Sequence, residues 1–221
     1  MNGDTLASLQ GALTEIYDLP PTPDVRDYLM TDRAGFDAGL GAETRASDEQ
    51  LIVAEEGDTL SMALYIDAAV LGRLARDDPF SGLTQDNLAD YLTVAEGVSH
   101  FVYVAWNTGY DKPVTLLELE LQAEVDKYVL CAWLLREQGA GRFPRELHRA
   151  LFERAHVDPV AAAGRVDLYH TASNYAARFC RRVAALLERK RHGVARDVMA
   201  ELRRFYRWGN LRKMRHIERC A

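Results

Sequence analysis

Long hydrophobic runs are missing from this sequence of 221 residues. Nowhere do about 18 consecutive apolar residues occur, which is roughly the number that a helix needs to span a bilayer. The N-terminus, MNGDTLASLQGALTEIYDLP, lacks the basic start and the continuous apolar stretch of a secretory signal. We therefore expect a soluble, cytoplasmic protein that has no membrane partner.

Cysteine is also scarce, and the three residues of this type, Cys131, Cys180 and Cys220, lie far apart. None belongs to a CxxC pair or to a nearby Cys/His pattern, so neither a disulfide framework nor a zinc finger is indicated. Glycine-rich phosphate loops of the GxGxxG and GxxxxGK[ST] types are absent, and so is the GxSxG elbow. These absences argue against the common nucleotide-binding loops and against a serine hydrolase.

The net charge of −6 hides a strong asymmetry along the chain. Residues 1–140 carry 8 Lys and Arg against 25 Asp and Glu, a net −17, whereas residues 141–221 carry 19 against 8, a net +11. Opposed charge on this scale indicates an acidic face and a basic face. The two faces could meet inside one molecule, pair in a homo-oligomer, or leave the basic side free for a polyanion.

The first 80 residues predict a small α+β part. Apolar residues at helical spacing predict a helix over 5–18, which the prolines of LPPTPD end. Residues 19–48 are rich in Pro, Gly and Asp, and we interpret them as a connector. Farther on, the alternation in TLSMALYID after a Gly57-Asp58 turn predicts a β-hairpin.

From Asp67 onward the hydrophobic pattern is helical. Longer helices are expected from an N-cap at Thr84 to about Trp106, over 114–138 and over about 161–193; shorter ones are expected over 68–76, 143–155 and 195–208, before a basic tail. TLLELELQ alternates as a strand would, but its continuity with AEVDKYVLCAWLLREQ favours a helix.

The fold class is therefore mainly α: a helical bundle with a small N-terminal α+β part that contains one β-hairpin. Residues 1–80 hold the N-terminal helix, the connector and the hairpin, and residues 81–221 hold the bundle with its basic C-terminal helices. The pattern is equally compatible with two domains and with one continuous domain.

Several polar residues occupy unusual positions in this pattern. Glu96 and His100, four residues apart in AEGVSHFVY, belong to a helix that is apolar almost all round and is therefore buried on several sides. Because an unpaired buried charge costs several kcal/mol, both side chains must be paired, hydrogen-bonded, coordinated or neutral. Glu120 and Glu124 raise the same question in the next helix, and His170 borders the apolar stripe of a third. Three helices would thus project these five residues into a common interior.

These five residues are candidate ligands of a divalent metal ion, and the same set without Glu120 is a candidate acid/base site. The two Glu-x-x-His pairs that dimetal ferritin-like proteins use are absent. The alternative is an ion-pair network, in which Glu96 and His100 bond to each other or to Arg178. In this network Glu120 and Glu124 face Lys127 and the basic C-terminal helices across the bundle. The chemistry would be hydrolase- or oxidase-like, and whether the chain is an enzyme stays open at this level.

The final 44 residues contain fourteen Lys and Arg but only four carboxylates. Candidate nucleic-acid contacts in RRFYRWGNLRKMRH, where aromatic residues are interleaved with basic ones, are Arg203, Arg204, Arg207, Arg212, Lys213 and Arg215. RVDLYH, from Arg165 to His170, resembles the Arg and His spacing of HEPN-type ribonucleases, and that resemblance implies an RNA partner; RFPRELH and RALFERAH share the spacing.

The function therefore has three readings: a metal or acid/base site in the bundle, a module that binds RNA, DNA or an acidic protein through the basic helices, and an oligomeric accessory protein. In the second hypothesis the basic helices do not pair with the acidic half of the chain and are free to bind a polyanion. In the third hypothesis the basic and acidic faces pair with each other in an oligomer.

Overall fold

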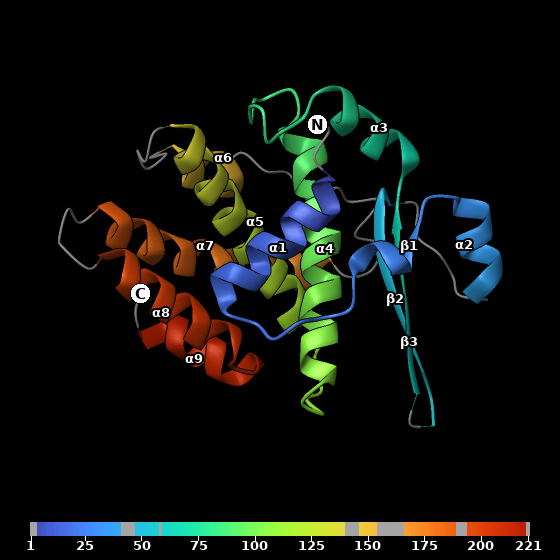
Figure 1. Ribbon diagram of the computed structural model, residues 1–221. Helices are drawn as coiled ribbons and strands as arrows, with labels where there is room; N and C mark the ends of the chain where they lie inside the picture. The colour runs from blue at the N-terminus through green and yellow to red at the C-terminus, as the bar shows by residue number, and fades with distance from the viewer. Residues whose placement is uncertain are drawn as a thin grey trace.

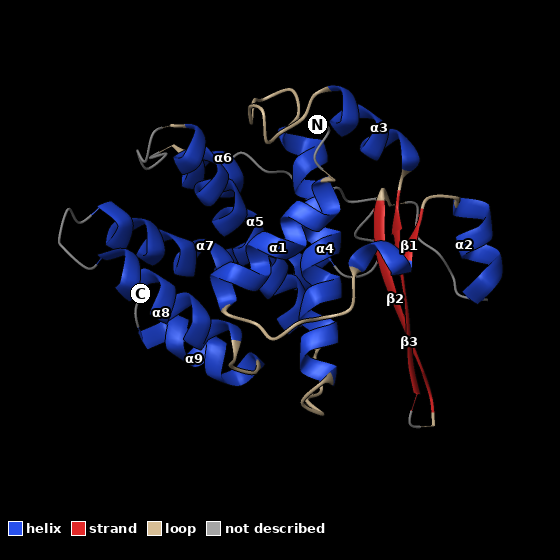
Figure 2. Ribbon diagram, viewed as in Figure 1, coloured by secondary structure: helices blue, strands red, loops and turns tan. Residues whose placement is uncertain are grey.

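The structure, a computed structural model, describes residues 4–40, 47–57, 59–139, 146–153, 166–188 and 194–219. Figure 1 shows a helical bundle with a small sheet at one side, and Figure 2 shows how little of the chain is strand. The N-terminal elements are α1 (Thr5–Tyr17), the 3-10 helix η1 (Val25–Tyr28), β1 (Leu29–Met30), α2 (Arg33–Leu40), β2 (Glu49–Glu56) and β3 (Thr59–Ile66). The later helices are α3 (Ala68–Arg76), α4 (Leu88–Thr108), α5 (Leu116–Gln138), α6 (Leu147–Phe152), α7 (Val166–Glu188), α8 (Val194–Tyr206) and α9 (Asn210–Arg219).

The expected fold class is confirmed, because the described chain is mainly helical and carries one small sheet with a hairpin in its N-terminal part. The predicted hairpin is β2 paired antiparallel with β3, in a register that sets Leu51 opposite Leu64. The short strand β1 adds to the other edge of β3 in a parallel direction, which gives the order β1-β3-β2. At the hairpin turn Gly57 has a φ of +60°, a conformation that costs glycine little.

The long helices α4 and α5 form the centre of the bundle. As the sequence predicted, α4 is buried on several sides, with Val94, Val98 and Phe101 fully inaccessible to solvent. The segment TLLELELQ does form the start of α5, where the Thr115 hydroxyl accepts a hydrogen bond from the Glu118 N–H at 3.2 Å and caps the helix. Helix formation here pairs the backbone groups of the helix interior within one buried segment, as burial away from water requires, and the Thr115 cap serves one of the first N–H groups.

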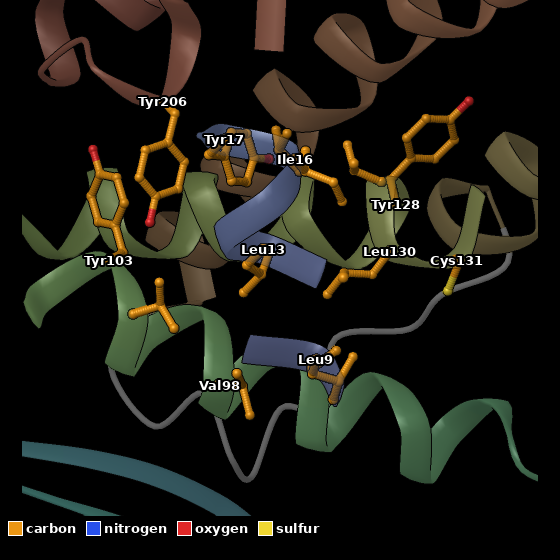
Figure 3. Close-up of a cluster of buried hydrophobic side chains, with 14 of the residues drawn as sticks. Leu9, Leu13, Ile16, Tyr17, Val98, Tyr103, Tyr128, Leu130, Cys131 and Tyr206 are labelled. Carbon is orange, nitrogen blue, oxygen red and sulfur yellow. The ribbon is translucent and has the colours of Figure 1, made fainter. Parts of the chain in front are cut away.

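The N-terminal helix α1 packs across α4, α5 and α8 (Figures 1 and 3). Its buried face carries Leu9, Leu13 and Ile16, each fully inaccessible to solvent, and each side chain contributes about 1.5–3 kcal/mol through burial. At its C-terminal end, Tyr17 stacks on Tyr206 of α8 with ring centroids 4.1 Å apart. One hydrophobic cluster therefore runs from the first described helix to the last.

The sheet is held against α4 by a close approach at Gly97. A Cβ atom at this position would lie 2.8 Å from Glu49 Cγ in β2 and 3.0 Å from Leu64 Cδ1 in β3. Any larger residue would therefore push the hairpin away from the helix. The absence of a side chain at Gly97 is what brings the first residue of β2 against the centre of α4.

Four predictions about the elements need correction. The connector over 19–48 is not structureless, because it includes η1, β1 and α2. Helix α4 begins at Leu88 rather than after Thr84, because the Asn87 side chain closes a turn before it by accepting from the Thr84 N–H and donating to the Gly82 carbonyl. The basic tail after Gly209 is helical and forms α9. Of the predicted helix over 143–155, the structure describes α6, Leu147–Phe152, with turns at residues 146 and 153; residues 143–145 and 154–155 lie outside the described residues, as do 161–165 and 189–193 of the helix expected over 161–193.

None of the described helices combines the length and the apolar character that a membrane crossing requires.

Candidate metal centre

Helix α5 carries polar side chains on two opposite faces. Glu118, Gln122 and Asp126 follow one another at four-residue spacing and face α1 and α9. Glu120 belongs to the other face, toward α4 and β2. All four side chains are buried, so each face requires its own set of partners.

His100 of α4 is the centre of the polar group on the second face. Its Nδ1 donates a hydrogen bond to Oε1 of Glu49 at 3.2 Å, and its Nε2 lies 3.6 Å from Oε2 of Glu120. The His100 side chain is 7% exposed, and Nε2 has no hydrogen-bond partner among the described residues. We call Glu49, Glu96, His100 and Glu120 the carboxylate–histidine cluster.

Three members of this cluster could bind one ion. Glu96, His100 and Glu120 each offer a ligand atom, and these atoms all lie within 4.8 Å of one another. Glu96 and His100 share a face of α4 because they are one helical turn apart, and Glu120 comes from the facing side of α5. Glu49 binds the opposite nitrogen of the imidazole, as the outer carboxylate of a carboxylate–histidine–metal arrangement does.

Lys127 borders the cluster and bridges two carboxylates. Its Nζ lies 2.9 Å from Oε2 of Glu96 and 2.6 Å from Oε1 of Glu124. The side chains of Glu96 and Glu124 are 28% and 25% exposed, against 10% for Glu49. Solvent therefore reaches the cluster on the side of Glu96 and its neighbour Glu124, whereas the side of Glu49 is shielded from solvent.

The charges around the cluster shift its pKa values in both directions. Burial alone would lower the pKa of His100, but the carboxylates of Glu49 and Glu120 outweigh it and raise that pKa well above its ordinary value. Burial raises the pKa of Glu49, although His100 acts in the opposite sense. Glu96 keeps a lowered pKa in spite of its burial because Lys127 and His100 favour its charged form.

The structure brings together only part of the set that the sequence proposed. Glu96, His100 and Glu120 do converge. Glu124 lies beside them, but its carboxylate is engaged by Lys127. His170 is exposed on α7 and does not join the group, because the buried stripe of that helix runs through Ala172, Ala176 and Phe179 instead. The expectation that His170 faces the interior is therefore corrected.

Glu49 is the member that sequence reasoning missed. It is the first residue of β2, and its contact with His100 joins positions 51 residues apart in the chain. Periodicity along one helix carries no information about such a partner. The signal that could have indicated a close neighbour is Gly97, a glycine inside an apolar helix between Glu96 and His100.

A second buried polar network lies on the other face of α5, around Asp126 and Lys213. Asp126 accepts hydrogen bonds from the Tyr17 hydroxyl at 2.5 Å, the Ser99 hydroxyl at 2.6 Å and Gln122 Nε2 at 2.7 Å. Lys213 of α9 is fully buried and donates to Gln122 Oε1 at 2.7 Å. We call this group the Asp126–Lys213 network.

The same network includes Tyr103 and Glu118. Lys213 Nζ donates to the Tyr103 hydroxyl at 2.8 Å, and that hydroxyl donates to Glu118 at 2.5 Å. The other oxygen of Glu118 accepts from the Asn210 N–H at 2.9 Å. Burial lowers the pKa of Lys213 to about 7 and raises that of Asp126 to about 6. The network ties α9 to the centre of the bundle.

The predicted nucleic-acid contacts separate into internal and external groups. Arg203 donates to the carbonyls of Ile16 and Glu15, and Arg207 donates to those of Tyr17 and Asp18. Both arginines thereby satisfy carbonyls at the end of α1, which a helix leaves without internal partners.

Two further basic residues are also engaged within the molecule: Arg204 pairs with Glu201 at 2.6 Å, and Lys213 is buried. Arg212 and Arg215 remain exposed on α9. Arg165 of the RVDLYH motif and the basic residues of 189–191 lie outside the described residues.

Comparison with known proteins gives no match to a family model, to a curated protein or to a solved structure.

Proposed function

We propose that this protein binds one divalent transition-metal ion at the carboxylate–histidine cluster and uses it in a hydrolase- or oxidase-like reaction. His100 Nε2, Glu96 and Glu120 would be the ligands, and Glu49 would orient the imidazole. The proposal is supported by three ligand atoms that converge within 4.8 Å of one another around a buried histidine, whose Nε2 faces Glu120 at 3.6 Å and makes no hydrogen bond among the described residues.

The contact with Glu49 supports ligation by Nε2 rather than by Nδ1. A carboxylate only accepts hydrogen bonds, so Glu49 fixes the proton of the neutral imidazole on Nδ1. In the metal-free protein the raised pKa of His100 keeps Nε2 protonated toward Glu120, and an ion that binds there would displace that proton and take up the Nε2 lone pair. Carboxylate partners of this kind hold the tautomer and the ring orientation of metal-binding histidines, and raise their basicity.

The charge balance also favours a cation. Among the residues that the structure describes, the positive partners of these carboxylates are Lys127 and His100, which face Glu49, Glu96, Glu120 and Glu124. With every group charged, the set carries a net −2 in surroundings that are mostly shielded from water. Such an excess is costly, and a divalent ion offsets it.

The donor types narrow the choice of ion. One imidazole and two carboxylates are hard and intermediate ligands, which suit Mn²⁺, Fe²⁺ or Zn²⁺ better than the soft ions that thiolates select. Three protein ligands leave coordination positions for water, as catalytic metal sites do. A bound ion would supply Lewis acidity or, if it is redox-active, electron transfer. The exposed side of Glu96 gives solvent a route to that position.

Metal content tests the proposal directly. We expect tag-free protein, stripped with a chelator and reconstituted separately with each of these ions, to retain about one equivalent of at least one of them. At a free metal concentration of 100 times Kd, binding adds about 2.7 kcal/mol to the stability. For a chain of this size the melting temperature should rise by about 5–10 °C.

Two histidine variants provide a matched comparison. His100→Gln should abolish both the metal content and the thermal shift, whereas His170→Gln, at the exposed position on α7, should leave both unchanged. Less than about a tenth of an equivalent of every ion after reconstitution, together with no thermal shift, would refute the metal site.

A second candidate function is polyanion binding by the C-terminal helices. The specific observation is that Arg212 and Arg215 project from α9 into solvent although the chain has an excess of carboxylates elsewhere. The partner would be a nucleic acid, an acidic protein, or the acidic half of a second copy in a homo-oligomer. Salt-sensitive retention on heparin, together with the mass in solution at low salt, separates these partners from one another.

A further inference from the structure

Helix α9 presents a line of three arginines to solvent. Arg212, Arg215 and Arg219 are exposed, and their spacing of three and four residues places them on one face of the helix. No described carboxylate forms an ion pair with any of the three. At 1.5 Å of rise per residue, the line covers about 10 Å of the helix axis.

An aromatic ring stands at the N-terminal end of this line. The guanidinium carbon of Arg212 lies 4.7 Å from the centre of the Trp208 ring, in a cation–π contact. Trp208 also meets the ring of His216 edge to face, with centroids 4.8 Å apart. These contacts hold the indole and the first guanidinium group in place before any partner arrives.

The same residues surround an open hollow of about 470 Å³, whose walls are Trp208, Leu211, Arg212, Arg215, His216 and Arg219. Its volume lies within the range of small-molecule sites, about 300–1,000 Å³. Leu211 is 69% exposed at its rim. A flat ring can therefore enter beside Trp208 while a negative charge meets the arginines.

We propose that Trp208, Arg212, Arg215 and Arg219 bind a single-stranded nucleic acid, with one base against Trp208 and the neighbouring phosphates on the three guanidinium groups. This inference rests on the second candidate function and assigns it to one face of α9. It leaves out Lys213, which is buried, and also Arg203, Arg204 and Arg207, whose guanidinium groups already bond within the molecule although Arg204 and Arg207 are exposed.

The chemistry of the hollow favours nucleic acid over an acidic protein. In an acidic peptide a flat ring beside the indole requires an aromatic residue next to the carboxylates, whereas every nucleotide of a strand carries a flat base beside its phosphate. Bases stack on aromatic side chains whatever their sequence, and phosphates pair with guanidinium groups in a geometry suited to two hydrogen bonds. Both components are adjacent here.

The fold leaves this face accessible. Figure 1 places α8 and α9 on the side of the bundle opposite the sheet. The buried anchor of α9 is Lys213, on another side of the helix from the arginines. A bound strand would therefore disturb neither the Asp126–Lys213 network nor the carboxylate–histidine cluster.

Fluorescence anisotropy with a labelled dodecamer of thymidylate tests the proposal on the full chain. Three phosphate contacts predict that the logarithm of the association constant falls with the logarithm of the salt concentration with a slope of about −2. Arg215→Ala should weaken binding and reduce that slope by about 0.7. Trp208→Leu should weaken binding roughly tenfold and leave the slope unchanged, because stacking releases no counterions.

Arg76→Ala is the matched control, since it removes one exposed arginine from α3, on the other side of the molecule. We expect it to change neither the affinity nor the slope. Circular dichroism should be the same for all variants, and the melting temperature should be unchanged in Arg215→Ala and Arg76→Ala, whose side chains are exposed. Trp208 is half-buried against the hydrophobic core, so Trp208→Leu should melt at a lower temperature, and its binding is measured well below that temperature.

Two results would overturn the assignment while sparing polyanion binding. The first is that Arg215→Ala and Trp208→Leu bind the dodecamer as tightly as the wild-type protein does. The second is that the wild-type protein binds polyglutamate as tightly as the dodecamer, and that Trp208→Leu does not weaken the binding of polyglutamate. Equal binding of a free thymidine monophosphate would refute recognition of a strand. If the wild-type chain binds neither the dodecamer, polyglutamate nor heparin at low salt, the second candidate function fails as well.

Discussion

Replacing Lys213 should change stability in a way that depends strongly on pH. In the folded chain this amine has a pKa of about 7, against an ordinary 10.5, because burial penalises its charge. Between these two pH values the unfolded chain binds one more proton than the folded chain. Stability therefore rises with pH in this window, by about 1.4 kcal/mol per unit, and this contribution is lost as the pH falls to 7.

Lys213→Met removes the titrating group and with it this slope. At pH 9 the wild-type amine is neutral and donates to Tyr103 and Gln122, so the variant loses two buried hydrogen bonds and should be less stable by about 1–3 kcal/mol. At pH 7 and below, the wild-type protein also carries the cost of a buried charge, which the variant avoids. The difference in stability between the two should therefore shift by about 2 kcal/mol in favour of methionine from pH 9 to pH 7, where the folded amine is half-protonated.

Urea denaturation of both proteins at pH 6, 7, 8 and 9 measures this shift. Lys112→Met, which removes an exposed lysine, controls for the general effect of losing one positive charge. If the stability curves of wild-type protein and Lys213→Met run parallel over this pH range, then Lys213 is not neutral in the folded state and the reasoning about its burial is wrong.

Three further predictions concern packing and ion pairs, and urea denaturation at pH 7 checks each of them. Gly97→Ala would set a Cβ 2.8 Å from Glu49 Cγ, so it should destabilise the fold by about 1–3 kcal/mol and weaken metal binding. The control is Gly11→Ala, where a Cβ meets nothing within 4 Å; it should stabilise the fold by about 0.4–1 kcal/mol. Equal effects of the two substitutions would show that the hairpin does not press against Gly97. Lys127→Met leaves the two carboxylates that it bridges without a cation and should cost about 2–4 kcal/mol; a neutral effect would show that the bridge is not formed. Arg207→Ala removes the hydrogen bonds to the last carbonyls of α1 and should cost about 1–2 kcal/mol, whereas no loss would mean that water replaces it fully.

The helices were predictable because each is specified by nearby residues. The apolar periodicity of 88–108 and 116–138 and the proline breaks around them suffice to locate α4 and α5. The same periodicity placed His100 and Glu120 on faces that are buried in the structure, with Glu96 half-buried at the edge of such a face. What it could not show was the start of α4, where the Asn87 side chain and a preceding turn compete with the cap expected at Thr84.

Partners from other elements were beyond sequence reasoning. Glu49 reaches His100 only because the hairpin packs at Gly97, and that contact depends on tertiary structure. Likewise, the spacing of Lys213 resembles that of the arginines around it, yet its side chain points to Tyr103 and Gln122. Charge patterning counts basic residues, but it does not distinguish an exposed one from a buried one.

The position of His170 shows that a small error in the predicted rotation of α7 about its axis exposes a residue that was expected to face the core. Its row continues through Asn174 and Arg178, and all three are exposed. The buried stripe of α7 instead contains Ala176 and Phe179. A rotation of the helix by about one residue, or 100°, separates the two assignments, and the stacking of Phe179 on a phenylalanine of α8 determines which one is realised.

If His100 Nε2 binds a metal ion, pulsed electron paramagnetic resonance of the Mn²⁺-loaded full chain should detect coupling of the ion to one histidine nitrogen. We expect this coupling in the wild-type protein and in His170→Gln, and its loss in His100→Gln. A spectrum of bound Mn²⁺ without nitrogen coupling, or one that His100→Gln leaves unchanged, would show that His100 is not a ligand.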